Sequence, residues 1–308
     1  MSQQIAEKIT ERLGILGKVD FPSYMKATCP RMDPPMPFDL PAYLDRIGLV
    51  HCSSDLTGLK ALQAAQISAI PFENVLPFLG KVPELDPDSL WKKLIADRCG
   101  GYCFELNSLL EDALSALGFS ARKVLARVRM GAAEGGARSH LAFVVPLEGT
   151  EWLVDTGFGG QAPAEPVRIS DEPQQIRDQV YRIRHEESSG EHVLERLTIE
   201  GWFPLYGFDR VEVRSVDIEA ANYLCATSPH QSFAASLKFY RLTAGGFISF
   251  LDGRARVTLR DEKREWQVVG NEALTRFLRQ DLDLGYDNGI IRALSERLET
   301  LVNEALPG

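Results

Sequence analysis

The hydrophobic periodicity of this 308-residue chain changes at Gly118, and the change restricts the folds open to it. Between Leu40 and Leu117, apolar residues recur every three or four positions, which is the spacing of buried helix faces. From Ala121 onwards, short runs such as 123–129 alternate apolar and polar residues, a pattern typical of strands. Helical segments followed by a strand-rich stretch predict an α+β fold, in which helices and sheets occupy separate regions.

The chain is expected to divide into an N-terminal extension and three folded parts. The folded parts are a helical domain (38–117), a β-barrel-like domain (118–220), and a linker helix with a C-terminal α/β lid (221–308). Within the lid we predict a hairpin that turns at Asp252-Gly253 and a final amphipathic helix over about residues 289–306. The extension, residues 1–37, opens with an amphipathic-helix pattern.

One cysteine stands at the mouth of a predicted helix. Cys103 follows Gly100-Gly101-Tyr102, and apolar residues at helical spacing continue after it as far as Leu117. The free N–H groups and partial positive charge of a helix N-terminus favour a thiolate. A cysteine in such a position is nevertheless most often a small buried hydrophobe, so a catalytic role depends on a base nearby.

A predicted hairpin supplies that base. Residues 139–146 and 151–160 read as two strands joined by a turn near Glu148, which places His140 roughly opposite Asp155. Cross-strand neighbours on one face have Cβ atoms about 5 Å apart, so Asp155 can orient the imidazole while its other nitrogen serves Cys103. A register slip of one residue would separate the pair. Taken singly, the histidine reads as a core residue and the aspartate as a turn residue.

Several blocks, in this order along the chain, resemble the arylamine N-acetyltransferases. The segments are Ile-Pro-Phe-Glu-Asn-Val (70–75), Gly-Gly-Tyr-Cys (100–103), Ser-His-Leu (139–141), Val-Asp-Thr-Gly-Phe-Gly (154–159) and Asn-Tyr-Leu-Cys-Ala-Thr-Ser-Pro-His-Gln-Ser-Phe (222–233). The similarity extends from about Phe38 to about Thr258. The resemblance implies a fold with a helical domain, a barrel-like domain and an α/β lid.

The resemblance also implies the residues and the reaction. The nucleophile, base and orienting carboxylate would be Cys103, His140 and Asp155. The substrate site would contain Phe72, Tyr102, Phe158 and Gly159. The implied reaction is a two-step, ping-pong acetyl transfer from acetyl-CoA, through an acyl-enzyme, to a small aromatic amine, hydrazine or N-hydroxyarylamine. Coenzyme A leaves after the first step.

One position departs from the family pattern. Where the family usually has arginine before the Gly-Gly pair, this chain has Cys99, and Glu73 loses its common partner. A partly buried carboxylate without a cation is costly, so we expect Arg98 to pair with Glu73. Protonation or solvation of Glu73 is the alternative. A disulfide or sulfenic-acid bridge between Cys99 and Cys103 is a further, less favoured option.

Composition agrees with an ordinary globular enzyme. The net charge of −9 argues against nucleic acid and against a polybasic membrane patch. Apolar runs are too short for a membrane span, and the first residues lack the apolar core of a signal peptide. Five cysteines without zinc-type spacing favour reduced thiols in a cytoplasm, and we expect no catalytic metal.

Three other functions stay open at this level. An amide synthase that cyclises or releases a carrier-bound polyketide would use the same fold and thiol. A hydrolase would use the same three residues, because Cys-His-Asp arrangements also occur in peptidases and transglutaminase-like enzymes. In a non-enzymatic binding protein, Cys103 would be no more reactive than Cys52 or Cys225.

Overall fold

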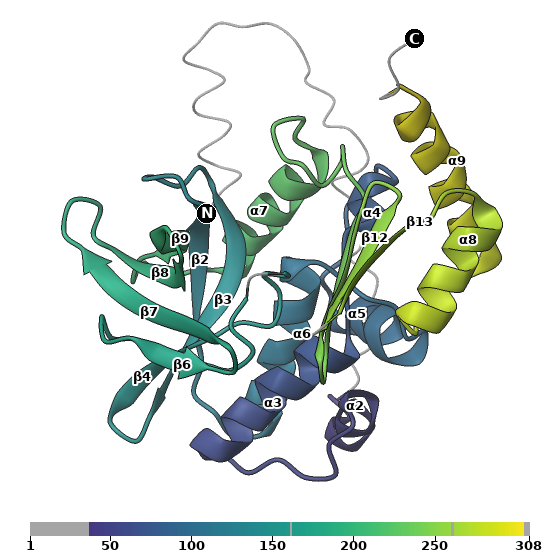
Figure 1. The fold of residues 1–308 in the computed structure, drawn as a ribbon. Helices are drawn as coiled ribbons and strands as arrows, with labels where there is room; N and C mark the ends of the chain where they lie inside the picture. Colours follow the sequence, from purple (N-terminus) through teal and green to yellow (C-terminus); the bar gives the residue numbers. More distant parts are fainter. Residues whose placement is uncertain (1–36, 161, 260–261, 305–308) are drawn as a thin grey trace, which may run out of the picture. The chain divides into compact units, whose positions relative to one another are not determined.

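The computed structural model describes residues 37–160, 162–259 and 262–304 (Figure 1). The expected helix in the N-terminal extension lies outside these residues. The described chain is a mixture of helices and two antiparallel sheets, which confirms the α+β prediction.

Helices fill the first part of the described chain, as the periodicity predicts. They are α2 (Leu40–Ile47), α3 (Leu56–Ala69), α4 (Val75–Phe78), α5 (Pro87–Trp91), the π-helical turn η2 (Lys92–Ala96) and α6 (Cys103–Ala116). Three begin at an aspartate whose carboxylate accepts a backbone N–H of the first turn: Asp39, Asp55 and Asp86. Gly118 follows α6 with φ +81°, a conformation that ends helices at little cost to glycine.

Eight strands form a nearly closed, barrel-like sheet in the order β5-β4-β3-β2-β9-β8-β7-β6 (Figure 1). Their bounds are β2 (Arg122–Val128), β3 (Arg138–Leu147), β4 (Thr150–Val154), β5 (Val167–Arg168), β6 (Gln174–Ile176), β7 (Gln179–Glu186), β8 (Glu191–Thr198) and β9 (Gly201–Phe208). The predicted hairpin is β3–β4, which turns at Glu148 and Gly149, both with positive φ. Ile183 of β7 donates its N–H to Ser170, just after β5, so the two edges of the sheet approach each other.

Five strands form the second sheet, in the order β1-β10-β11-β12-β13. They are β1 (Phe72–Glu73), β10 (Lys238–Thr243), β11 (Gly246–Leu251), β12 (Arg254–Leu259) and β13 (Lys263–Gln267). The predicted Asp252-Gly253 hairpin is β11–β12, while β10 and β13 were not expected. The helices that follow are α8 (Asn271–Arg276), the π-helical turn η3 (Phe277–Asp281) and α9 (Asn288–Glu304), the last of them as predicted.

The linker helix begins earlier than the sequence suggested. We expected it after Asn222, whereas α7 runs from Ser215 to Thr227. Its first turn is capped by Asp217, whose carboxylate accepts the N–H of Arg214 at 2.9 Å. The apolar residues of α7 pack with the helical part, because Ile218, Ala221 and Cys225 belong to the same hydrophobic cluster as the core of α6.

Three hydrophobic clusters form the core, and β3 is shared by two of them. Leu141, Phe143 and Val145 pack against the helices, while Ala142 and Val144 face the interior of the barrel-like sheet. This follows from the alternation of side chains along a strand. The third cluster lies in the C-terminal part, under the second sheet and its helices. Strand β3 therefore connects α6 to the barrel.

Candidate active site

Helix α6 presents Cys103 at its first residue. Tyr102 precedes the helix, and its N–H donates to the Glu105 carboxylate at 3.1 Å, which satisfies one of the free donors of the helix end. The thiol of Cys103 is 3% exposed and donates to the carbonyl of Ser139, with 3.8 Å between sulfur and oxygen. The nucleophile predicted from sequence therefore lies between the helix N-terminus and strand β3.

The hairpin brings His140 and Asp155 together. Nε2 of His140 lies 2.7 Å from Oδ2 of Asp155, and both side chains are buried. The pairing of Phe143 with Val154 shows that the two are not directly opposite: Asp155 is level with Ala142, so His140 is its diagonal neighbour on the same face. Because Nε2 faces the carboxylate, Nδ1 is the ring nitrogen available to Cys103.

Three further donors hold the Asp155 carboxylate. They are Asn107 Nδ2 at 2.9 Å, the Gly157 N–H at 2.8 Å and the Tyr206 hydroxyl at 2.9 Å. Burial acts to raise the pKa of Asp155, but His140, Asn107 and Gly157 together bring it below its usual value. Asp155 is therefore a charged hydrogen-bond acceptor that fixes the orientation and tautomer of the imidazole.

Sequence reasoning did not find Asn107 or Tyr206. A signal for Asn107 was present, because it lies four residues after Cys103, on the same helix face, where an apolar residue would be expected. It bridges the helix to the hairpin by donating to Asp155 and accepting the Thr156 N–H at 3.0 Å. Nothing local marks Tyr206, which reaches the site from β9, 51 residues after Asp155.

The electrostatics of the thiol differ from the expectation based on its helix position. Burial raises the pKa of Cys103 well above its usual value, and Cys225 and Asp155 add to the increase. The backbone N–H groups of Leu141 and Phe104 act in the opposite direction but do not outweigh it. Burial therefore favours the protonated thiol at this position, opposite to the effect expected from the helix N-terminus alone.

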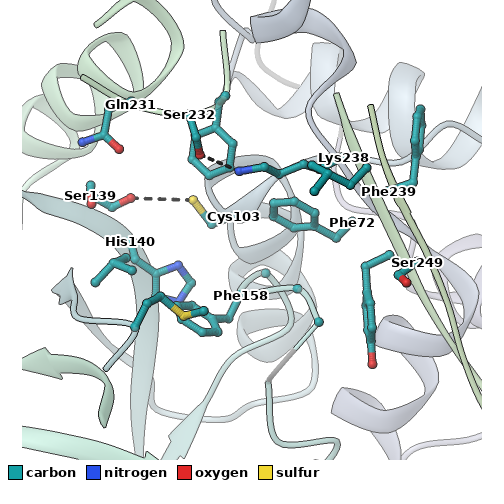
Figure 2. Close-up of a pocket in the computed structure, with 18 of the residues that line it drawn as sticks. Phe72, Cys103, Ser139, His140, Phe158, Gln231, Ser232, Lys238, Phe239 and Ser249 are labelled. Carbon is teal, nitrogen blue, oxygen red and sulfur yellow. Dashed lines mark hydrogen bonds between the residues drawn. The ribbon is translucent and has the colours of Figure 1, made fainter. Parts of the chain in front are cut away.

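The thiol and the imidazole face a cavity of about 540 Å³ (Figure 2). Phe72, Phe158 and Gly159, predicted as substrate-site residues, line it, and the ring of Phe158 lies 5.0 Å from that of His140. Tyr102 is not among the lining residues. It is fully buried, and its hydroxyl donates to Asn222, so it supports the cavity wall from behind.

A glycine allows the hairpin to approach the helix. A Cβ atom at Gly157 would lie 2.7 Å from the Cα of Cys103, closer than such atoms ever come. Gly157 also donates its N–H to Asp155. The close approach of Gly157 therefore brings the hairpin into contact with both Cys103 and Asp155.

The predicted partner of Glu73 was wrong. Lys93, from η2, binds two buried carboxylates, with Nζ 2.9 Å from Glu73 Oε1 and 2.7 Å from Glu105 Oε1. Arg98 instead adopts φ +51° and pairs with Asp283 at 2.9 Å, where both side chains are half exposed. The cation thus comes from a turn upstream of the Gly-Gly motif. Lys93 keeps its charge because the two carboxylates raise its pKa despite burial, which acts to lower it.

Cys99 fills an apolar position next to this ion cluster. It packs with the C-terminal hydrophobic cluster, whereas Cys103 belongs to the helical one. Both thiols are free, so the structure contains no bridge between them. Burial raises the pKa of Cys99 to about 12, which makes it a neutral side chain.

Neither a metal site nor a membrane-spanning helix is found among the described residues. No group of three or more His, Cys, Asp or Glu side chains within them is arranged to hold a metal ion. No helix in this part of the chain combines the length and apolarity needed to cross a bilayer.

Comparison with known proteins places the fold and the site in a family. A family model described as N-acetyltransferase matches residues 55–291. The arylamine N-acetyltransferase of Mycolicibacterium smegmatis is 38% identical over 66% of this chain and 76% of the relative. The arylamine N-acetyltransferase / N-hydroxyarylamine O-acetyltransferase of Salmonella typhimurium is 36% identical over 68% of this chain and 75% of the relative.

Solved structures of arylamine N-acetyltransferases have a similar fold. The Salmonella typhimurium enzyme superposes with a TM-score of 0.79 at 30% identity, over 85% of this chain and 98% of the other. The Mycobacterium marinum arylamine N-acetyltransferase in complex with CoA gives 0.77 at 27% identity, over 85% and 99%. With a family model over most of its length, and relatives that are 36–38% identical over about three quarters of their own length, the chain belongs to the arylamine N-acetyltransferase family.

Proposed function

We propose that this protein transfers the acetyl group of acetyl-CoA to arylamines, arylhydrazines or N-hydroxyarylamines, with Cys103 as the acyl carrier. The observation that carries the proposal is that His140, held by Asp155 at 2.7 Å, lines the same cavity as the buried thiol of Cys103. The relatives are named acetyltransferases, which favours acetyl transfer over the amide-synthase and hydrolase alternatives.

The first half-reaction forms the acyl-enzyme. Sγ of Cys103 attacks the thioester carbonyl, and Nδ1 of His140 takes the thiol proton. Asp155 stabilises the resulting imidazolium through Nε2–H. The tetrahedral intermediate collapses, the bond to coenzyme A breaks, and the proton passes from His140 to the departing sulfur. The raised pKa of Cys103 makes this base necessary, since a buried thiol does not lose its proton unaided.

The second half-reaction uses the same groups. The amine nitrogen of the acceptor attacks the acyl carbon, His140 accepts a proton from that nitrogen, and the Cys103 thiolate leaves to be reprotonated. The rings of Phe72 and Phe158 provide apolar walls for a flat aryl group. The N–H groups of Phe104 and Leu141, which interact with Sγ, are candidate donors to the developing negative charge.

The proposal also covers the acyl donor and the cellular compartment. A relative binds CoA in its solved structure, which supports acetyl-CoA as the donor here. We propose that the enzyme works in the cytoplasm, where thiols stay reduced.

Intact-mass analysis tests the proposal. After mixing with acetyl-CoA, the protein should gain the mass of one acetyl group, and Cys103→Ala should gain none. Cys225→Ala is the matched control, because this second buried thiol donates to the same Ser139 carbonyl at 3.4 Å. Steady-state rates should give parallel double-reciprocal lines. An adduct that persists in Cys103→Ala, or intersecting lines without any adduct, would overturn the proposal.

A further inference from the structure

A second buried thiol lies beside the nucleophile and has no part in the proposed reaction. Cys225, near the end of α7, is fully buried and donates to the carbonyl of Ser139 at 3.4 Å. The Cys103 thiol donates to the same carbonyl oxygen at 3.8 Å (Figure 2). The two sulfur atoms are therefore separated by no more than the sum of these two distances. A buried cysteine is most often a small apolar side chain, but that role does not require two thiols at one acceptor.

A buried hydrogen bond fixes α7 against the start of α6. The hydroxyl of Tyr102, one residue before Cys103, donates to the side chain of Asn222, three residues before Cys225. Asn222 in turn donates from Nδ2 to the carbonyl of Pro83 at 2.9 Å. Both cysteines belong to the hydrophobic cluster of the helical part. The two thiols are thus held as neighbours by contacts on either side of them.

The other described thiols are placed differently. Cys99, the bridging partner considered from the sequence, packs in the C-terminal cluster, apart from Cys103. Cys52 donates to the carbonyl of Gly58 at 3.3 Å. Among the cysteines that the structure describes, Cys225 is therefore the one that shares a hydrogen-bond acceptor with the nucleophile.

The two neighbouring thiols differ in access. Cys103 lines the cavity of about 540 Å³, so a molecule as small as hydrogen peroxide reaches its sulfur. Cys225 is not among the lining residues, and its side chain has no exposed surface. Burial also raises the pKa of Cys225 to about 12. Oxidation from solution therefore begins at Cys103, and Cys225 reacts only with a group that Cys103 already carries.

We propose that Cys103 and Cys225 form a reversible disulfide when the protein meets a peroxide, with Cys225 as the resolving cysteine. The inference rests on the proposed function in one respect, the transfer of the Cys103 proton to His140. A disulfide holds its sulfur atoms about 2 Å apart, so the side chains must rotate away from the Ser139 carbonyl to form it. The bond would stop acyl transfer and protect the nucleophile from irreversible oxidation.

The chemistry balances in two steps. The Cys103 sulfur, having given its proton to His140, attacks one oxygen of hydrogen peroxide. The O–O bond breaks, and the second oxygen leaves as hydroxide and takes the proton from His140 to become water. Cys103, oxidised by two electrons, now carries a sulfenic acid. The Cys225 sulfur attacks the Cys103 sulfur, the S–O bond breaks, and the departing hydroxyl takes the Cys225 proton as a second water. A dithiol reverses the bond by exchange.

Mass spectrometry without reductant tests the disulfide. Wild type, Cys225→Ala and Cys52→Ala are treated with hydrogen peroxide, and N-ethylmaleimide then blocks free thiols before digestion. Wild type should lose the mass of two hydrogen atoms and give one linked peptide pair containing Cys103 and Cys225. Cys52→Ala is the matched control, because it removes another buried thiol that donates to a backbone carbonyl, and it should behave like wild type. Cys225→Ala should give no linked pair and should gain oxygen atoms instead.

Recovery of acetyl transfer is the second readout. Before peroxide, all variants should accept an acetyl group from acetyl-CoA. After peroxide, dithiothreitol should restore most of the activity of wild type and Cys52→Ala. The restored fraction should be several-fold smaller in Cys225→Ala, because its sulfenic acid proceeds to sulfinic acid, which thiols do not reduce. Cys225→Ser keeps the size of the side chain and should give the same loss, which excludes an effect of the cavity left by alanine.

Three outcomes would overturn the inference. They are a linked pair that joins Cys103 to a different cysteine, wild type that gains oxygen without any link, and equal restored fractions in wild type and Cys225→Ala. Failure of the proposed function looks different. If peroxide links the pair but the protein acetylates no amine, the acetyl-transfer proposal fails and the disulfide stands. If amines are acetylated and no link forms, the inference alone fails.

Discussion

At the scale of single residues, Asp155 is where the polar contacts of the site converge. Its carboxylate receives donors from α6, from its own hairpin and from β9, through Asn107, Gly157 and Tyr206. Burial acts to raise the pKa of Asp155, but His140, Asn107 and Gly157 lower it below its usual value. The imidazole orientation therefore depends on three distant segments of the chain.

Removing the Tyr206 hydroxyl tests this dependence. In Tyr206→Phe the ring contacts with His140 and Phe158 stay, but the carboxylate loses one donor. Hydrogen bonds to charged groups contribute roughly 1.5–3 kcal/mol, so kcat/KM for acetyl-CoA should fall about tenfold or more. Because a donor to the charged form is lost, the pKa of Asp155 should rise and the acidic limb of the pH–rate profile should move to higher pH. Tyr223→Phe, on an exposed ring, is the control; equal rates in all three proteins would contradict the argument.

Lys93 is the second residue on which the local structure depends. Lys93→Met would leave Glu73 and Glu105 buried without a cation, which should cost about 3–5 kcal/mol in the free energy of unfolding. Arg98→Ala and Lys92→Met break exposed, solvent-screened pairs, so each should cost far less than Lys93→Met. Urea titrations of the three variants give these values directly.

The pH dependence of the Lys93→Met variant has a definite sign. Burial already raises the pKa of Glu105 in the folded protein, and removal of the cation should raise it further. The folded variant then binds more protons than the unfolded chain, so its stability should increase as the pH falls toward the usual carboxylate range. A deficit relative to wild type that stays constant between neutral and acidic pH would contradict a buried, unpaired carboxylate.

At the scale of elements, the arrangement of Cys103, His140 and Asp155 depends on how closely the β3–β4 hairpin approaches α6. The segment after β4 carries Asp155 and Gly157, and the latter touches the backbone of Cys103. The two-residue turn at Glu148-Gly149 sets the register, which places His140 and Asp155 on one face. A displacement of the whole hairpin would move His140 and Asp155 together.

Gly157→Ala tests this contact between elements. Its Cβ must displace the loop or the helix end, and an error of about 1 Å in such a site costs on the order of 100-fold in rate. The formation rate of the acetyl adduct, followed by rapid-mixing mass spectrometry, should fall accordingly. Gly136→Ala is the matched control, since a Cβ added there would meet no atom within 4 Å and its φ is ordinary. Equal adduct rates in both variants would contradict the proposed close approach.

At the scale of the whole described molecule, charged pairs outside the active site shape the response to acid. Arg129, nearly buried in the barrel-like sheet, pairs with Glu186 at 2.6 Å and Glu191 at 2.7 Å, and Arg184 adds a second contact to Glu186. These hydrogen bonds lower the pKa of Glu186 to about 2. Its pairing therefore stabilises the folded state above the usual carboxylate pKa and is lost as the pH falls toward about 2.

The Glu186→Gln variant measures this contribution. It should be less stable than wild type at pH 7, and the difference should shrink progressively below the usual carboxylate pKa because wild type loses the same interactions by protonation. Chemical denaturation at several pH values gives the comparison, with the exposed Glu187→Gln as the control. A difference that is independent of pH would assign the effect to packing instead.

Much of the site could be inferred from the sequence, because its main residues lie in short segments whose patterns predict a helix or a hairpin. A helix that starts at Cys103 follows from 3.6-residue periodicity, and the His140–Asp155 pair follows from a hairpin of two adjacent strands. The predicted start of the linker helix and the predicted partner of Glu73 were both wrong, for the same reason. Both depend on contacts made by side chains several residues away from the motif, namely Asp217 capping α7 and Lys93 reaching inward from η2.

The sequence by itself determined the fold class, the family blocks and the candidate nucleophile, base and carboxylate, because periodicity and short motifs act over a few residues. Only the tertiary structure decided which side chains complete the site. Tyr206 reaches Asp155 from 51 residues away, and Lys238, which lines the cavity, is anchored by Asn74 across 164 residues. Such contacts produce no periodic pattern in the sequence, because they form only when distant segments of the chain pack together.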